Sequence, residues 1–210
     1  MKPLEKQLAK NLLQINAIKF NPANPFSWSS GWKSPIYCDN RKTLSYPEIR
    51  KNIKESFANF IREQYPQAEV IAGVATGAIA MGALTAEELG LPFVYVRSKA
   101  KGHGLQNLIE GKIDAGQNVV VIEDLISTGR SSLNAVEALR EAGAIVQGMA
   151  AIFSYGFQLA GDNFRQANCP LHMLTNYNTL IEVALEHGYL KKENIQDLED
   201  WRKDPANWKQ

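Results

Sequence analysis

The stretch Val121-Ile-Glu-Asp-Leu-Ile-Ser-Thr-Gly-Arg-Ser131 decides the fold of this 210-residue chain. The apolar run from Val119 to Ile122 predicts a buried strand; two adjacent carboxylates follow, and a hydroxyl-rich turn leads into a helical pattern. The N-terminus of a helix has unbonded N–H groups and a partial positive charge, so it favours phosphate. Carboxylates beside it suit sugar hydroxyls or a hydrated metal ion. The stretch therefore predicts a sugar-phosphate site.

Strands and helices alternate along most of the chain. The apolar patterns predict strands over 70–74, 93–96, 118–122, 144–153 and 171–175 and helices over 4–15, 47–65, 78–89, 131–141 and 157–167. This α/β alternation is typical of a parallel sheet covered on both faces, whose ligands bind at the carboxyl ends of the strands. Residues 21–46 predict short strands and loops. Residues 194–210 predict a polar tail that docks by Trp201 and Trp208.

Composition excludes several classes of partner. The formal net charge of +1 and the pI near 7.7 give no basic face for nucleic acid. Two cysteines, Cys38 and Cys169, are too few for a disulfide framework and suit a reducing compartment. The N-terminal residues lack the apolar core of a signal peptide, and no apolar run approaches the roughly 20 residues that span a membrane. We therefore expect a cytoplasmic protein without nucleic-acid or membrane partners.

The stretch from Val121 to Ser131 resembles the phosphoribosyl pyrophosphate (PRPP) motif of type I phosphoribosyltransferases, which joins an apolar strand, an acidic pair and a Ser/Thr-Gly turn. The resemblance implies that family's fold: a central, mostly parallel sheet flanked by helices, with a small N-terminal hood. It implies that PRPP is bound by Glu123, Asp124, Leu125, Ile126, Ser127, Thr128, Gly129, Arg130 and Ser131. The alternative is an ordinary strand–helix junction with Ser and Thr as helix caps and solvated acids.

A polar loop, residues 97–111, follows the strand over 93–96 and carries four cations or potential cations within seven residues. By composition alone, a solvated connection between strands is as well supported as a functional loop. The pattern Arg-x-x-x-Lys-x-His-Gly is similar to the mobile catalytic loop of orotate phosphoribosyltransferases, and it implies that PRPP is also bound by Arg97, Lys101 and His103. The family often places a lysine directly after the arginine, where this chain has Ser98 followed by Lys99.

The chemistry that the resemblance implies assigns roles to these residues. PRPP loses pyrophosphate through an oxocarbenium-like state, so negative charge accumulates on the leaving group and pre-placed cations stabilise it. Lys101 and His103, together with Asp124, are therefore the predicted catalytic residues. Mg²⁺ fits as the ion that bridges pyrophosphate and ribose hydroxyls while keeping most of its waters. We expect no side chain to bind it directly, with Asp124 contacting it through water.

Small residues fill the segment Ala72-Gly-Val-Ala-Thr-Gly-Ala78 after the first strand of the sheet. They let backbone N–H groups approach an anion closely. The segment resembles the family's pyrophosphate loop and implies PRPP contacts at Ala75, Thr76 and Gly77, although the lysine that some members carry there is absent. Close packing of strand and helix is the alternative. The segment is not a Walker A loop, because no Gly-Lys-Ser/Thr follows it.

The motif Ser-Gly-x-x-Ser-Pro-x-Tyr within Ser29–Arg41 resembles the hood of orotate phosphoribosyltransferases, which purine-using relatives lack. It implies that orotate is bound by Tyr37, Cys38, Lys33 and Ser127, with Arg41 as a further candidate for the carboxylate. Packing of an aromatic-rich loop is the alternative. Two base-pocket cations of some members are absent, since Ser29 stands at one position and residues 154–157 read Ser-Tyr-Gly-Phe at the other.

The expected activity is transfer of ribose 5-phosphate from PRPP to orotate, giving orotidine 5′-monophosphate and pyrophosphate in pyrimidine nucleotide synthesis. The alternatives are a phosphoribosyltransferase for a purine or another base, and a non-catalytic regulator that senses PRPP on the same fold. The resemblance also implies a homodimer whose active-site loops are shared between subunits. We expect residues 1–46 to form the N-terminal helix and hood, 47–190 the core, and 191–210 a tail packed on the core. His172 and His187 lack ligand spacing and are expected to be packed or surface side chains.

Overall fold

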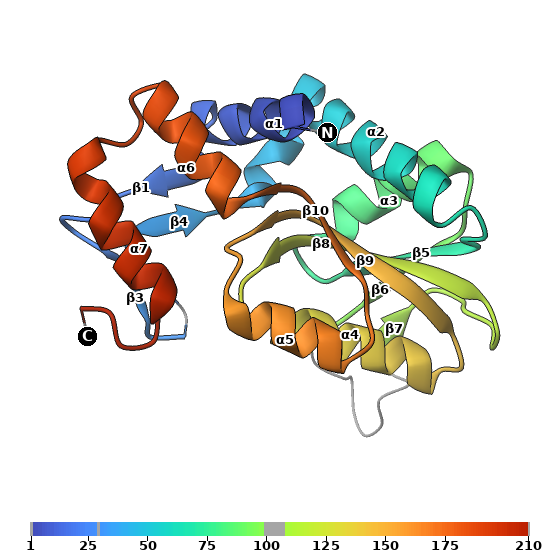
Figure 1. The fold of residues 1–210 in the computed structure, drawn as a ribbon. Coiled ribbons are helices and arrows are strands. Elements are labelled where there is room, and N and C mark those ends of the chain that lie inside the picture. Colours follow the sequence, from blue (N-terminus) through green and yellow to red (C-terminus); the bar gives the residue numbers. More distant parts are fainter. Residues whose placement is uncertain (1, 29, 99–107, 210) are drawn as a thin grey trace.

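A six-stranded sheet with the order β10-β9-β8-β5-β6-β7 lies at the centre of the computed structural model, which describes residues 2–28, 30–98 and 108–209 (Figure 1). Its strands are β5 (Val70–Val74), β6 (Phe93–Val96), β7 (Ile109–Glu110), β8 (Asn118–Ile126), β9 (Ile145–Ser154) and β10 (Leu171–Asn176). Neighbouring strands are parallel except β6 and β7, which run antiparallel. The predicted mostly parallel sheet is confirmed.

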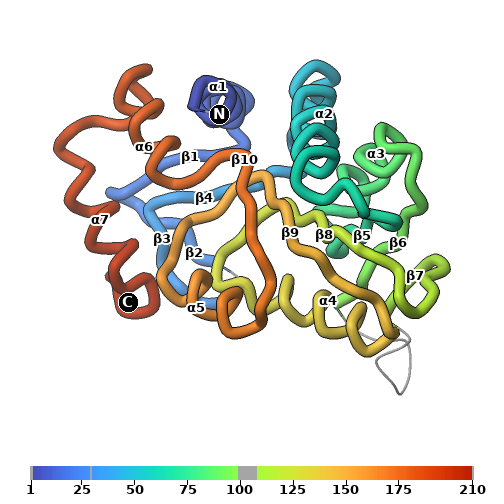
Figure 2. The backbone as a smooth tube through the Cα atoms, turned by 45° about the vertical axis from the view of Figure 1, so that its right-hand side comes forward, coloured from blue at the N-terminus to red at the C-terminus, as the bar shows by residue number. Residues whose placement is uncertain are grey.

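Helices cover both faces of this sheet (Figures 1 and 2). One face carries α1 (Lys2–Gln14), α2 (Pro47–Gln64) and α3 (Ile79–Leu89), and the other carries α4 (Arg130–Glu141) and α5 (Gln158–Gln166). Side chains of β8 alternate between the two faces, as in any strand. Val120 and Ile122 therefore join the apolar cluster that includes α1 and α2, whereas Val119 and Val121 join the one beneath α4.

Strand β8 is longer than its apolar run predicts. The expected strand over 118–122 continues to Ile126, so the acidic pair lies inside the strand and not after it. The reason is the neighbouring strand β9, which runs on to Ser154 and pairs with Glu123, Leu125 and Ile126 through Ala151, Phe153 and Ser154. Backbone pairing thus outweighs the polar side chains, and it fixes the acids on a rigid element.

Short elements form the hood segment, as expected for residues 21–46. They are β2 (Phe26–Ser27), which pairs with β3 (Lys33–Ser34), then β4 (Ile36–Cys38) and the 3₁₀ helix η1 (Asn40–Ser45). The antiparallel partner of β4 is β1 (Ile18–Phe20), which the sequence patterns did not predict. This pairing places β1 and β4 beside the C-terminal helices in Figure 1.

The C-terminal region contains two helices that were not predicted. They are α6 (Tyr177–Glu186) and α7 (Ile195–Lys203), with the 3₁₀ helix η3 (Lys192–Asn194) between them. Residues 195–203, which were predicted only as part of a polar tail, therefore form a helix. Both tryptophans that were predicted to dock are buried, since Trp201 is fully buried and Trp208 is 9% exposed. None of the helices in the described part of the chain is long and apolar enough to cross a bilayer.

Candidate active site

The carboxyl ends of β5 and β8 lie side by side at one edge of the sheet. From β5 the chain continues through α3 to β6 on one side, and from β8 it continues through α4 to β9 on the other. Open α/β sheets bind ligands where connections diverge in this way, because the loops there leave a crevice. Residues 75–77 follow β5, and residues 127–129 follow β8, so both predicted phosphate loops open into this crevice.

Asp124 and Gly77 are in direct contact across the crevice. A Cβ atom added to Gly77 would overlap the carboxylate of Asp124. The peptide bond between Ala75 and Thr76 is cis. The structure thus brings together two motifs that lie 47 residues apart, since Gly77 and Asp124 touch. The absence of a side chain at Gly77 allows the acid to reach the loop.

We expect Gly77→Ala to lower kcat/KM by about tenfold, because the added methyl group must displace the Asp124 carboxylate and misplacement of a reacting group is costly. Steady-state kinetics with both substrates would measure the loss. Gly161→Ala is the matched control, since a Cβ there meets nothing within 4 Å. Equal kinetics for the two variants would show that Asp124 does not need this contact.

The turn after β8 presents an uncapped helix N-terminus to the crevice. Gly129 is the N-cap residue of α4, with φ +78° and no side-chain hydrogen bond to the helix. The first N–H groups of a helix lack partners within it, so they remain for an anion. The alternative of an ordinary junction with Ser or Thr as the cap is therefore wrong. Arg130 and Ser131 open the helix and are exposed.

Glu123 lies beneath the turn and holds it to the strand. Its carboxylate, 5% exposed, accepts hydrogen bonds from Ser132 Oγ at 2.8 Å and from the backbone N–H of Asp124 at 2.9 Å. Burial raises the pKa of this carboxyl well above its usual range, and the neighbouring Asp124 charge raises it further. The solvated acid pair of the alternative interpretation is wrong for Glu123. Direct binding of PRPP by Glu123 stays a prediction.

Asn40 connects the hood segment to strand β8. Its buried side chain donates from Nδ2 to the backbone carbonyl of Asp124 at 2.6 Å, and its Oδ1 accepts from Cys38 Sγ at 3.3 Å. The sequence patterns did not single out Asn40, although it lies inside the hood motif Ser29–Arg41. A buried amide with both ends bonded stabilises one arrangement of these two segments.

A cavity of about 1160 Å³ opens between the hood segment and the turn after β8. Three of the four predicted orotate contacts line it, namely Tyr37, Cys38 and Ser127. Its other aromatic lining residues, Trp28, Trp32 and Tyr155, were not predicted as contacts. Lys33 instead donates to Ser27 Oγ, and Arg41 is paired with Asp39 at 2.7 Å. Burial raises the pKa of the Cys38 thiol, so Cys38 contributes a neutral wall. We call this the base cavity.

A second cavity of about 500 Å³ adjoins the base cavity, because Asn134 lines both. It contains three residues that were predicted to bind PRPP: Ala75, Arg97 and Ser131. Arg97 Nη1 lies 3.2 Å from Glu110 Oε1, which orients its guanidinium along the cavity wall. Lys101 and His103, predicted for catalysis, lie outside the described residues, as do Lys99 and Ser29.

Comparison with known proteins identifies the family. Residues 41–154 match the phosphoribosyl transferase domain. The chain is 59% identical, over 208 residues, to the orotate phosphoribosyltransferase of Bacteroides thetaiotaomicron, covering 99% of this chain and 98% of that one. The chain belongs to the orotate phosphoribosyltransferase family. The Phocaeicola vulgatus relative is also 59% identical, with the same coverage. The solved orotate phosphoribosyltransferase of Aeropyrum pernix is 28% identical over 88% of this chain and 99% of its own, with a TM-score of 0.76.

One of the two departures from the family's pattern, residues 154–157, lies at the base cavity, because Tyr155 lines it. The resemblance implies an arginine near this position in some members, whereas this chain has Tyr155, which is only 2% exposed. Arg130, at the start of α4, is the cation that lines the cavity within the described part of the chain. His172, as expected, is a packed side chain that stacks on Phe60 with ring centroids 3.7 Å apart.

Proposed function

We propose that this protein transfers the ribose 5-phosphate group of PRPP to orotate, yielding orotidine 5′-monophosphate and pyrophosphate in pyrimidine nucleotide synthesis. The observation that carries the proposal is the pair of adjoining cavities. Tyr37, Cys38 and Ser127 line the one that fits a base, while Ala75 and Ser131 line its neighbour beside the phosphate loops. The 59% identity to curated orotate phosphoribosyltransferases, which extends over nearly the whole chain, supports orotate as the base.

Each part of the site has a role in this reaction. The N-terminus of α4 and the turn 127–131 suit the 5-phosphate, and the loop 75–77 suits pyrophosphate, because both present backbone N–H groups. Asp124, between them, suits the ribose hydroxyls. Negative charge accumulates on departing pyrophosphate, so Arg97 and the predicted loop cations Lys101 and His103 act there. A closed loop would also exclude water and protect PRPP from hydrolysis.

Mg²⁺ fits this site as an ion that arrives with PRPP. Mg²⁺ prefers oxygen ligands and keeps several waters, so substrate phosphates and one or two carboxylates suffice to hold it. Among the described residues no group of three or more His, Cys, Asp or Glu side chains is gathered for a metal. We propose that Asp124, whose half-buried carboxylate lies beside Gly77, contacts it through water. When bound, the ion would neutralise charge on pyrophosphate.

The test is pyrophosphate release from PRPP and Mg²⁺ against a panel of orotate, uracil, adenine and guanine. We expect orotate to react faster than any other base by on the order of a hundredfold or more, because a site that bonds a polar group rejects analogues without it. Preference for a purine would support the rival transferase. Failure with all four bases, in a protein that binds PRPP, would support the regulator.

We further propose a cytoplasmic homodimer in which the loop from Lys99 to Gly111 of each chain covers the partner's site. The resemblance to dimeric relatives and the long cationic loop support this arrangement. We also propose the division into residues 1–46 as N-terminal helix and hood, 47–190 as core, and 191–210 as a packed tail. Both cysteines of the chain are unpaired and buried, which suits a reducing compartment.

A further inference from the structure

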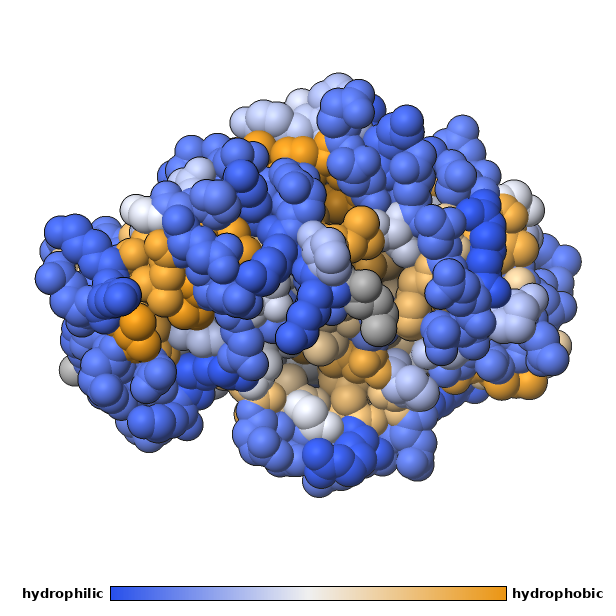
Figure 3. Space-filling view, turned by 45° about the horizontal axis from the view of Figure 1, so that its top comes forward, coloured by the Kyte–Doolittle hydropathy of each residue, from blue (hydrophilic) through white to orange (hydrophobic). Residues whose placement is uncertain are grey.

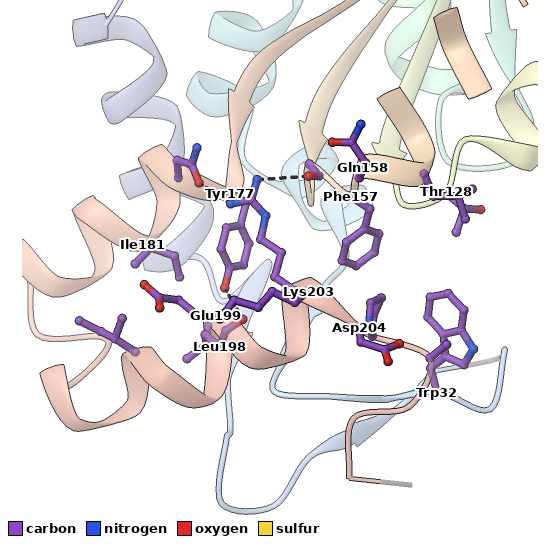
Figure 4. Close-up of a pocket in the computed structure, with 17 residues that line it drawn as sticks. Trp32, Thr128, Phe157, Gln158, Tyr177, Ile181, Leu198, Glu199, Lys203 and Asp204 are labelled. Atoms are coloured by element: carbon purple, nitrogen blue, oxygen red, sulfur yellow. Dashed lines mark hydrogen bonds between the residues drawn. The ribbon is translucent and has the colours of Figure 1, made fainter. Parts of the chain in front are cut away.

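The C-terminal segment forms a wall beside the base cavity. Helices α6 and α7 and the turn after β9 enclose a separate cavity of about 860 Å³. In Figure 4, Tyr177 and Leu198 lie on one side of it, and Phe157 and Thr128 lie on the other. Thr128 also lines the base cavity, as do two further shared residues, Trp32 and Leu159. Figure 3 shows a mainly hydrophilic surface with an indentation at its lower margin.

Aromatic rings carry the contact from α7 to the base cavity. Trp201 is fully buried, and its ring lies 5.7 Å from the rings of Trp28 and Tyr155, edge-on to both. Trp28 and Tyr155 are themselves 4.9 Å apart and line the base cavity. Edge-to-face aromatic pairs at these distances are attractive. Trp28 and Tyr155, which line the base cavity, therefore pack against Trp201 of α7.

Arg202, the next residue of α7, anchors the turn that carries Tyr155. Its Nη2 donates to the carbonyl of Gly156 at 3.1 Å, and its Nη1 donates to Asn178 Oδ1 at 2.6 Å. The guanidinium also lies over the ring of Tyr177, 4.7 Å from its centroid. One side chain thus joins α6, α7 and the turn after β9.

The turn has a glycine, Gly156, at the point where the guanidinium of Arg202 contacts it. Gly156 has φ +66°, and a Cβ there would lie 2.8 Å from Arg202 Nη2, so a larger residue would meet the guanidinium. The backbone N–H of Gly156 donates to Ser154 Oγ at 3.0 Å, and Tyr155 N donates to the Ile126 carbonyl at 3.1 Å. The turn is therefore held to β8 on one side and to α7 on the other.

We infer that Arg202 is a positioning residue for the base: by holding the Gly156 carbonyl it fixes Tyr155 and Trp28, and it sets the affinity for the base and not the rate of phosphoribosyl transfer. The inference rests on the proposed function. Its physical reason is the place of the contact, which lies on the base side of the site. Asp124 and Gly77, on the phosphate side, are held together by their own direct contact.

Arg202→Ala should raise the KM for orotate by about five- to tenfold, the effect of about one ordinary net hydrogen bond, with kcat and the KM for PRPP within about twofold of wild type. Steady-state kinetics, with each substrate varied in turn, would measure this. Arg202→Lys should stay impaired, because lysine keeps the charge but lacks the planar fork that spans two acceptors. Asn178→Ala, which removes one acceptor, should shift the same KM less.

Lys203→Ala is the matched control, since this neighbouring cation is 71% exposed and contacts Asp200 on its own helix. Its kinetics should equal those of wild type. Three results would overturn the inference. They are an unchanged KM for orotate in folded Arg202→Ala, an equal rise of the KM for orotate and the KM for PRPP in that variant, or a wild-type KM for orotate in Arg202→Lys. Should Arg202→Ala fail to fold, an unchanged KM for orotate in Asn178→Ala would overturn it. A wild type that releases no pyrophosphate with orotate would instead refute the proposed function.

Discussion

Asp124→Asn should lower kcat by on the order of a hundredfold to a thousandfold, the usual loss when one preorganised charge-stabilising group is removed. Its carboxylate touches Gly77, and it sits on β8 between the two phosphate loops, where it can bond ribose hydroxyls or metal-bound water. The amide has the same shape, and the backbone carbonyl that accepts from Asn40 remains. Thermal stability should therefore change little. Kinetics and a melting curve on the same preparation would separate the two effects.

Asp114→Asn supplies the control for this experiment, because Asp114 is an exposed acid in a surface connection that pairs with Lys112. It should leave both kcat and the melting temperature unchanged. If Asp124→Asn instead lost stability and activity in proportion, Asp124 would be a structural acid. Asp124 would then have no part in the chemistry.

Mixing inactive Lys101→Ala chains with inactive Asp124→Asn chains should restore activity. Lys101→Ala alone should lower kcat/KM by on the order of a hundredfold or more, because it removes a cation from the leaving group. If each loop covers the partner's site, one site of a hybrid dimer receives an intact loop and an intact acid. With free exchange, about half of the dimers are hybrids and recovery approaches about a quarter of wild-type activity.

The control mixture contains Lys101→Ala chains and chains that carry both substitutions, so no dimer has a complete site. It should remain inactive. Formation of hybrids can be followed with one chain tagged. An inactive test mixture that contains hybrid dimers would place the loop over its own subunit's site, and the proposed shared site would then be wrong.

Local sequence patterns predicted the elements that carry the PRPP motifs. The apolar run before Glu123 and the small residues at 75–77 each reflect the conformation of their own neighbourhood, so a short stretch of sequence is enough to predict it. The same patterns missed the end of β8, because its last residues depend on pairing with β9. They also missed α6, although Tyr177, Leu180 and Val183 have helical spacing and are buried.

Contacts between distant segments account for the residues that sequence reasoning did not assign. Asn40 gains its role from the carbonyl of Asp124, 84 residues away, and Arg202 gains its role from Gly156, 46 residues away. Nothing in the spacing around either residue encodes such a partner. Glu123 shows the converse, since the motif identified it as an acid of the site while its bond to Ser132 turns the carboxylate inward.

The aromatic cluster at the base cavity also gives the protein an optical reporter of its own. Trp28 lines that cavity, and its ring lies 4.9 Å from Tyr155 and 5.7 Å from Trp201. Indole emission responds to the polarity and to the ring neighbours of its surroundings. A molecule that enters the cavity changes the surroundings of Trp28, so we expect the emission of the unlabelled protein, which has four tryptophans, to change with occupancy of the base cavity and without turnover.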